Sequence, residues 1–196
     1  MTINLAALVG SRICHDLISP IGAIGNGVEL LSLTDGDTDA EMDLINESVQ
    51  NANARIRFFR IAYGAANEDQ RVSRPEITSI LSATARGGRF TYFWHVGSDQ
   101  PRRIVRCALL LMQCCEAALP TGGDIHVVLD GDQWRVSAEG PRLSIDHALW
   151  ETMTTPDISY DYKAAQVQFA LVPDMMAKAK RTLRLSLTDD KIVALF

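Results

Sequence analysis

Two regularly spaced series of apolar residues near the N-terminus constrain this chain more than any other feature. In the first series the members are alternately four and three residues apart: Leu17, Ile21, Ile24, Val28 and Leu31. The second series keeps the pattern through Met42, Ile45, Val49, Ala52, Ile56, Phe59 and Tyr63. An α-helix turns by about 100° per residue, so this spacing lines one face of a helix with apolar side chains. The sequence therefore predicts two long helices, the first over residues 4–33.

The segment between the two series, residues 34–39, is rich in Thr, Asp and Gly and offers N-cap candidates for the second helix. Two long helices joined by a short polar turn predict an antiparallel hairpin. One hairpin cannot bury two apolar faces, so we expect two copies of the chain to form a four-helix bundle, which makes the protein a homodimer. The alternative is that the hairpin packs on the rest of its own chain. Heptad-like spacing favours the bundle.

A histidine lies on the opposite face of the first helix. His15 falls roughly 160° from the centre of the apolar series. Asp16 follows it, Pro20 removes one backbone hydrogen bond a turn later, and Gly22 and Gly25 each cost about 1 kcal/mol relative to Ala. An exposed helical histidine is ordinary by itself. The neighbouring acid and the tolerated helix breakers indicate a surface shaped for function, which small or polar residues share: Ser19, Gly22 and Asn26.

Residues 14–31 read CHDLISPIGAIGNGVELL. The order of His, an acid, Leu, two variable residues, Pro and an apolar run resembles the H-box of histidine kinases. The longer form, from Cys14 to Leu31, resembles the ChpT-type histidine phosphotransferases of alphaproteobacterial phosphorelays. The resemblance implies that His15 accepts a phosphoryl group from the aspartyl phosphate of one receiver domain and passes it to the aspartate of another. A histidine is largely neutral at pH 7, which leaves a ring nitrogen free to attack.

Bulk properties exclude several classes of function. The 196 residues are 47% apolar and carry a net charge of −5, which argues against binding to nucleic acid. No stretch reaches the roughly 18 apolar residues of a membrane span, and no basic leader precedes the first apolar run. The four cysteines show no CxxC pair, and Cys114 and Cys115 fit buried thiols in a reducing compartment. We expect a cytoplasmic protein without a membrane partner.

The chain divides into a hairpin over residues 1–66, a linker near residues 64–70 and a second domain over residues 70–196. Helices are expected over residues 76–85, 101–119 and 161–179, and strands over residues 90–96, 124–129, 134–138, 182–187 and 191–196. This order predicts an α+β fold in which an antiparallel or mixed sheet carries helices on one face. His95, His126 and His147 have no partner at metal-ligand spacing, so no metal site is expected in this chain.

The second domain resembles the Bergerat domain that binds ATP in histidine kinases, with three departures. Glu116 stands where the family has a metal-binding Asn, and Ala138 stands where it has an adenine-contacting Asp. Residues 166–170, QVQFA, replace the glycine-rich phosphate loop, whose small residues let backbone amides approach a phosphate. The sequence therefore predicts a degenerate ATPase-like domain that binds neither ATP nor another cofactor. The Mg²⁺ of the reaction is expected on the partner receiver domain.

The resemblance also implies roles and partners. Asp16 is expected to orient His15 or to accept its proton. The donor would be the receiver of a hybrid histidine kinase and the acceptor a cell-cycle response regulator, with the second domain supplying a further contact patch. The residues predicted to contact these receivers are Arg12, Ile18, Ser19, Ile21, Gly22 and Asn26. Two alternatives are a non-catalytic dimeric module that sequesters response regulators, and an ATP-dependent histidine kinase.

Overall fold

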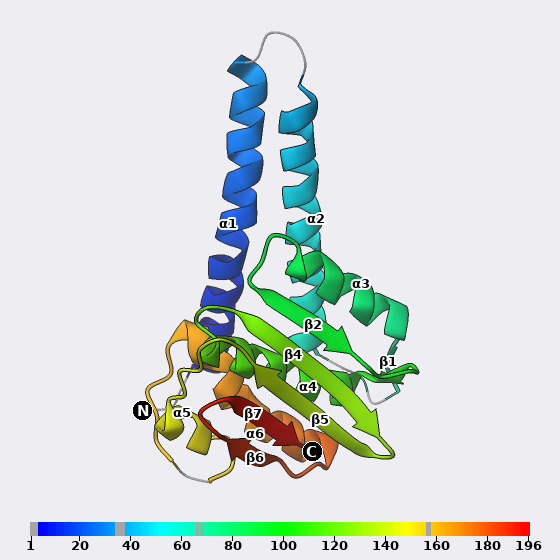
Figure 1. The fold of residues 1–196 in the computed structure, drawn as a ribbon, viewed down its shortest axis with the longest axis vertical. Helices are drawn as coiled ribbons and strands as arrows, with labels where there is room; N and C mark the ends of the chain where they lie inside the picture. Colours follow the sequence, from blue (N-terminus) through cyan, green and yellow to red (C-terminus); the bar gives the residue numbers. More distant parts are fainter. Residues whose placement is uncertain (1–3, 34–37, 66, 68, 156–157) are drawn as a thin grey trace.

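The computed structural model describes residues 4–33, 38–65, 67, 69–155 and 158–196. Helices α1 (Leu5–Leu33) and α2 (Asp39–Ala62) lie side by side as an antiparallel hairpin that projects from the rest of the molecule (Figure 1). This confirms the predicted hairpin. The predicted turn at residues 34–37 lies outside the described residues. Thr38, one of the N-cap candidates, occupies the N-cap position of α2 without a side-chain cap hydrogen bond.

The most buried positions of α1 are two residues that the apolar spacing did not single out. Pro20 and Gly27 are the buried residues of α1. A Cβ atom built on Gly27 would lie 2.6 Å from Cγ1 of Ile45, so glycine lets the two helices approach here. The backbone remains helical through Pro20.

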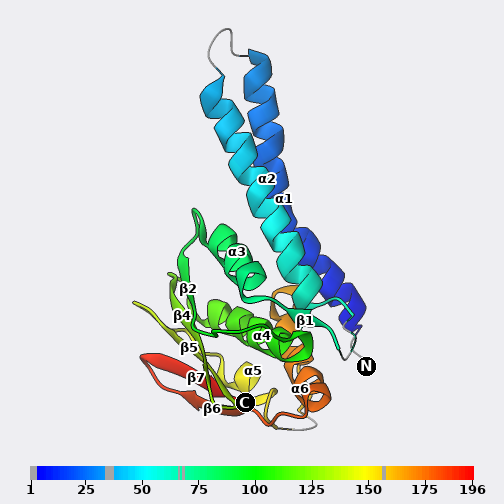
Figure 2. The ribbon, with the colours of Figure 1, turned by 90° about the vertical axis from the view of Figure 1, so that its right-hand side faces the viewer.

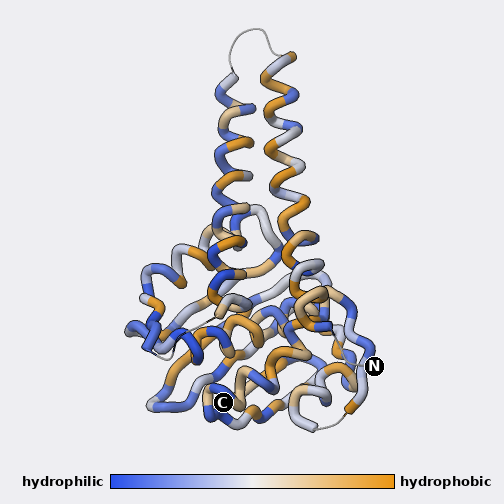
Figure 3. Tube along the Cα trace, turned by 180° about the vertical axis from the view of Figure 1, so that it is seen from behind, coloured by the Kyte–Doolittle hydropathy of each residue, from blue (hydrophilic) through white to orange (hydrophobic). Residues whose placement is uncertain are grey.

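The two apolar series are only partly covered within one chain. Leu17, Ile24 and Leu31 are half-buried. Figure 3 shows apolar segments recurring along both helices of the hairpin. A second set of side chains stays open, and we call it the uncovered apolar face: Ile21 (58% exposed), Val28 (54%), Met42 (44%), Val49 (38%) and Ile56 (51%).

The second domain is built on a five-stranded mixed sheet. Its strands lie in the order β2 (Phe90–Trp94), β4 (Gly123–Asp130), β5 (Gln133–Glu139), β7 (Lys191–Leu195) and β6 (Arg184–Leu187). The pair β2–β4 is parallel and the other three pairs are antiparallel. A two-stranded pair, β1 (Arg71–Val72) with β3 (Gln100–Pro101), was not expected, because two-residue strands leave no periodic signal.

Helices cover one face of the sheet, the face on the side of the hairpin, as Figure 2 shows from the side. They are α3 (Arg74–Ala85), α4 (Arg102–Ala118), the short α5 (His147–Glu151) and α6 (Val167–Ala179). Helix α4 is the centre of the core, and its Cys114 and Cys115 are fully buried free thiols, as expected. Within the residues that the structure describes, no helix is both long and apolar enough to cross a bilayer.

The helix expected over residues 161–179 is wrong at its start. A 3₁₀ turn, η1 (Ala164–Gln166), comes first and α6 begins at Val167. Side-chain hydrogen bonds account for the difference. The side chain of Gln166 accepts from the backbone N–H of Lys163 at 3.0 Å, and the Tyr160 hydroxyl donates to Asp146 at 2.9 Å. These contacts hold the preceding segment in a non-helical conformation, which local sequence did not indicate.

The base of the hairpin is packed into the second domain. Phe58, Phe59, Ile61 and Ala62 belong to the same buried core as α4. Two arginines of α4 bind the carbonyl end of α2: Arg102 donates to the carbonyl of Arg60, and Arg106 donates to that of Ala62 at 2.8 Å. Cations at a helix C-terminus also suit the helix dipole. The base of the hairpin therefore packs on the rest of its own chain, as the alternative to the bundle proposed. The remainder of the hairpin extends away from the second domain (Figure 1).

Candidate functional site

His15 stands on the outer face of α1, as its helical position predicts. Its side chain is 84% exposed. Nδ1 of the ring lies 3.2 Å from Oδ1 of Asp16. This contact occupies one ring nitrogen and leaves Nε2 as the atom that an incoming group can reach.

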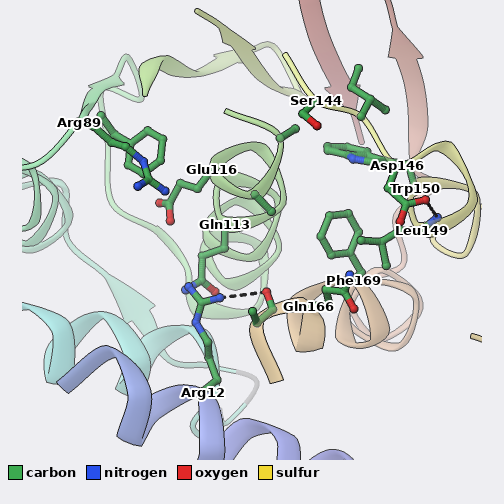
Figure 4. A pocket seen from close by; sticks show the side chains of 15 residues that line it. Arg12, Arg89, Gln113, Glu116, Ser144, Asp146, Leu149, Trp150, Gln166 and Phe169 are labelled. Carbon is green, nitrogen blue, oxygen red and sulfur yellow. Dashed lines mark hydrogen bonds between the residues drawn. The ribbon is translucent and has the colours of Figure 1, made fainter. Parts of the chain in front are cut away.

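The side chain of Asp16 is largely buried and is held by Arg12. Its side chain is only 13% exposed, and its Oδ2 accepts a hydrogen bond from Nε of Arg12 at 2.7 Å. Arg12, itself 16% exposed, also donates from Nη1 to the backbone carbonyl of Ala165 in η1 at 3.0 Å. Figure 4 shows Arg12 reaching from α1 towards this turn. The carboxylate is thus fixed by Arg12 on one oxygen and faces His15 with the other.

Arg12 differs from the other residues predicted to contact a partner, because it is bonded within the chain and they are exposed. Its guanidinium bonds within the chain, and the sequence carries no signal of this because Ala165 is 153 residues away. Ile18 (68% exposed) and Ile21 (58%) are open to solvent. Ser19, Gly22 and Asn26 are exposed as well. A Cβ atom on Gly22 would meet no atom within 4 Å, so the packing of this chain does not require glycine there.

The second domain contains a cavity of about 610 Å³ beside this site, shown in Figure 4. Arg12 lines it, together with Arg89, Glu116 and Asp146. The Tyr92 hydroxyl donates to Glu116 Oε1 at 2.9 Å. Burial raises the pKa of Glu116, which the Tyr92 hydrogen bond and the charge of Arg12 only partly oppose. The half-buried carboxyl therefore gives up its proton less readily than a free carboxyl group does.

The other two departures from the ATP-binding pattern are interior positions. Ala138 is fully buried in β5. Val167, Gln168 and Phe169 are fully buried at the start of α6. Large side chains therefore occupy the segment in which the ATP-binding pattern has glycines.

The remaining histidines lie apart from His15. Phe93 stacks on His126 with ring centroids 4.4 Å apart, and His95 continues the stack at 6.2 Å from Phe93. His147 is exposed at the start of α5. Among the residues that the structure describes, no group of three or more His, Cys, Asp or Glu side chains is placed to hold a metal ion.

Comparison with known proteins decides the family. The model of the histidine phosphotransferase C-terminal domain matches residues 74–191. This chain belongs to the histidine phosphotransferase family. The protein phosphotransferase ChpT of Brucella abortus (strain 2308) is 32% identical over 178 residues, which are 87% of this chain and 85% of that protein.

The structural similarity to this family extends over the whole chain. A bacterial phosphotransferase solved at 1.7 Å matches with a TM-score of 0.81 and 30% identity, covering 100% of this chain and 98% of that one. The helical hairpin is therefore part of the similarity, although the family model matches only the second domain of this histidine phosphotransferase. The catalytic domain of the histidine kinase ThkA matches at a TM-score of 0.45 and 15% identity, over 65% of this chain and 92% of that one.

Proposed function

We propose that this histidine phosphotransferase carries a phosphoryl group on His15 between the aspartates of receiver domains. The observation that carries the proposal is the pairing of an 84% exposed imidazole with a carboxylate that is itself only 13% exposed. An exposed ring can meet the active site of another protein. A fixed carboxylate on one ring nitrogen presents the other nitrogen for attack.

On the side of this chain, the transfer requires only the His15 ring and the Asp16 carboxylate. Nε2 of His15 attacks the phosphorus of the aspartyl phosphate, a P–N bond forms, and the P–O bond to the aspartate breaks. The leaving group is a carboxylate, and the ring gains positive charge that the carboxylate of Asp16 stabilises through Nδ1–H. Transfer to a second receiver is the same step reversed. The receiver domain supplies the Mg²⁺ that neutralises the phosphoryl oxygens.

We propose that the cavity of the second domain does not serve ATP. Glu116 is held by Tyr92 and has a raised pKa, so it is less available to a cation than a free carboxyl group is. The buried residues at the start of α6 support the same proposal, because a phosphate needs open backbone amides there. The phosphoryl group would then come from a receiver domain, and the protein would need no cofactor of its own.

The proposed assembly is a homodimer whose hairpins form a four-helix bundle. Met42, Val49 and Ile56 of the uncovered apolar face are seven residues apart, as are Ile21 and Val28. Such heptad spacing is typical of a seam between helices of a bundle. The half-buried members of the series alternate with these open ones, so one set serves the hairpin and the other set is available to a second copy.

The proposed partners are the receiver of a hybrid histidine kinase as donor and a cell-cycle response regulator as acceptor, both in the cytoplasm. Ile18 and Gly22 would form the apolar part of the docking surface around His15, with Ser19 and Asn26 as its polar part, whereas Ile21 belongs to the uncovered apolar face and would be covered by the second copy. Exposed apolar side chains beside a reactive histidine are suited to contact with another protein.

The decisive experiment is transfer of labelled phosphate from a phosphorylated receiver domain to the purified full-length protein. We expect label on the wild type and on His147→Asn, which changes another exposed histidine, but none on His15→Asn. Labelled ATP alone should label none of them. Labelling from ATP would contradict the assignment of the second domain. Binding of receivers without any labelling of the wild type would instead support a sequestering module.

A further inference from the structure

We propose that Arg12 is a positioning residue through which the second domain sets the orientation of Asp16 and His15. This inference rests on the proposed role of His15 as the phosphoryl carrier. The sequence placed Arg12 among the partner-binding residues. In the structure its guanidinium instead joins α1 to the 3₁₀ turn η1, which lies 153 residues further along the chain.

The geometry uses two separate nitrogens of one planar group. Nε donates to Oδ2 of Asp16 at 2.7 Å, and Nη1 donates to the Ala165 carbonyl at 3.0 Å. A guanidinium can make both bonds at once because its donors are fixed in one plane. Lysine has a single charged nitrogen and would pair with only one of the two oxygens at these positions.

The exposed Ala165 carbonyl is tied to the interior of the second domain by a buried side chain. It also accepts a hydrogen bond from Nε2 of Gln168 at 3.0 Å, and Gln168 is fully buried. The same nitrogen lies 3.4 Å from the carbonyl of Gln113, whose side chain accepts from the Tyr63 hydroxyl at 2.7 Å. Arg12 thus bonds to a point that is held by α4, by α6 and by the residue that follows α2.

By fixing Asp16, Arg12 influences which nitrogen of the His15 ring carries the proton. With Oδ2 held by Arg12, Oδ1 of Asp16 faces Nδ1 of the ring at 3.2 Å. A carboxylate accepts and cannot donate, so this contact favours the Nδ1–H tautomer and leaves the lone pair on Nε2. In a ring without such a partner the proton is distributed over both nitrogens. A smaller fraction of the molecules then has the Nε2 lone pair free to attack phosphorus.

The test compares Arg12→Gln and Arg12→Lys with a matched control in the full-length protein. Lys178 also pairs with an aspartate four residues away in a helix, at 2.7 Å from Asp174, but on α6 and outside the site. Lys178→Gln therefore removes a helical ion pair without touching His15. Three quantities are measured: the first-order transfer rate from a saturating phosphorylated receiver, the affinity for that receiver, and the tautomer of His15 by ¹⁵N NMR.

We expect Arg12→Gln to lower the first-order transfer rate by about 10- to 100-fold, since small misplacements of reacting groups have effects of this size. Its affinity for the receiver should stay at the wild-type value, and the Nδ1–H population of His15 should fall. Arg12→Lys should restore part of the rate and of the tautomer, because it pairs with Asp16 alone. Lys178→Gln should match the wild type in all three.

An unchanged rate and tautomer combined with weaker receiver binding would overturn the proposal and make Arg12 a contact residue. Failure of the proposed function looks different, because the wild type itself would then accept no phosphate from the receiver. The tautomer comparison needs no phosphate and still decides whether Arg12 positions the ring. If Arg12→Gln does not fold, Arg12→Lys retains the charge next to Asp16 and carries the same comparison.

Discussion

The uncovered apolar face of the hairpin leads to a quantitative expectation for Ile56→Glu. Ile56 is 51% exposed in the single chain and occupies one of the heptad positions of α2. If two hairpins pair through this face, both copies of Ile56 become buried in the dimer. The substitution then places two carboxylates in an apolar interface.

The magnitude follows from the exposed fraction. Full burial of an Ile side chain stabilises by about 1.5–3 kcal/mol, so the exposed half of Ile56 offers about 1 kcal/mol per copy on dimerisation. Glutamate loses this gain and adds the cost of removing a charge from water, which is several kcal/mol without a partner. A total of at least about 4 kcal/mol corresponds to a dissociation constant roughly 1,000-fold higher.

Sedimentation velocity over a series of protein concentrations measures this constant. Ile158→Glu is the control, because Ile158 is 36% exposed and lies in the second domain, outside the uncovered apolar face. It should leave the dimer unchanged. A wild-type protein that is monomeric at all concentrations, or an Ile56→Glu variant with the wild-type dissociation constant, would refute the argument for a bundle.

Three further outcomes are expected. Gly27→Ala should destabilise the fold by about 1–2 kcal/mol in denaturant unfolding, because its Cβ would lie 2.6 Å from Ile45. The control Gly10→Ala, whose Cβ would have no atom within 4 Å, should stabilise the fold by up to about 1 kcal/mol. Equal effects of the two substitutions would contradict the close contact at Gly27. Burial raises the pKa of Glu116 from its ordinary 4.5, so the folded chain binds this proton more tightly than the unfolded chain and loses stability as pH rises through that value. Glu116→Gln should therefore raise Tm at neutral pH and change it little well below pH 4.5, and a lower Tm at neutral pH would reverse the assigned direction. Asp16→Asn should slow single-turnover phosphotransfer by about 100-fold or more while receiver binding persists; a wild-type rate would remove Asp16 from the mechanism.

The sequence by itself determined the elements that depend on local spacing. The alternating intervals of the two apolar series specify the hairpin, because a helix places every third and fourth residue on one face. The same periodicity places His15 on the outer face. The strands of the sheet and helices α3 and α4 followed from their own patterns and from the turn residues between them. The motif around His15 was sufficient to indicate the family.

Only the tertiary structure decided what depends on contacts between distant residues. It divided the apolar series into half-buried and open members, which one-dimensional spacing cannot distinguish. It also showed that Pro20 and Gly27 are the buried residues of α1 and that Gly27 lies close to Ile45 of α2. Arg12 is the clearest case, since a basic residue three positions before a reactive histidine suggests a surface contact. Its two partners, Asp16 and the Ala165 carbonyl, become neighbours only when the 3₁₀ turn before α6 folds against α1. Hydrogen bonds between segments 153 residues apart leave no periodic trace in the sequence, and for that reason the fold alone revealed how the carboxylate beside His15 is held.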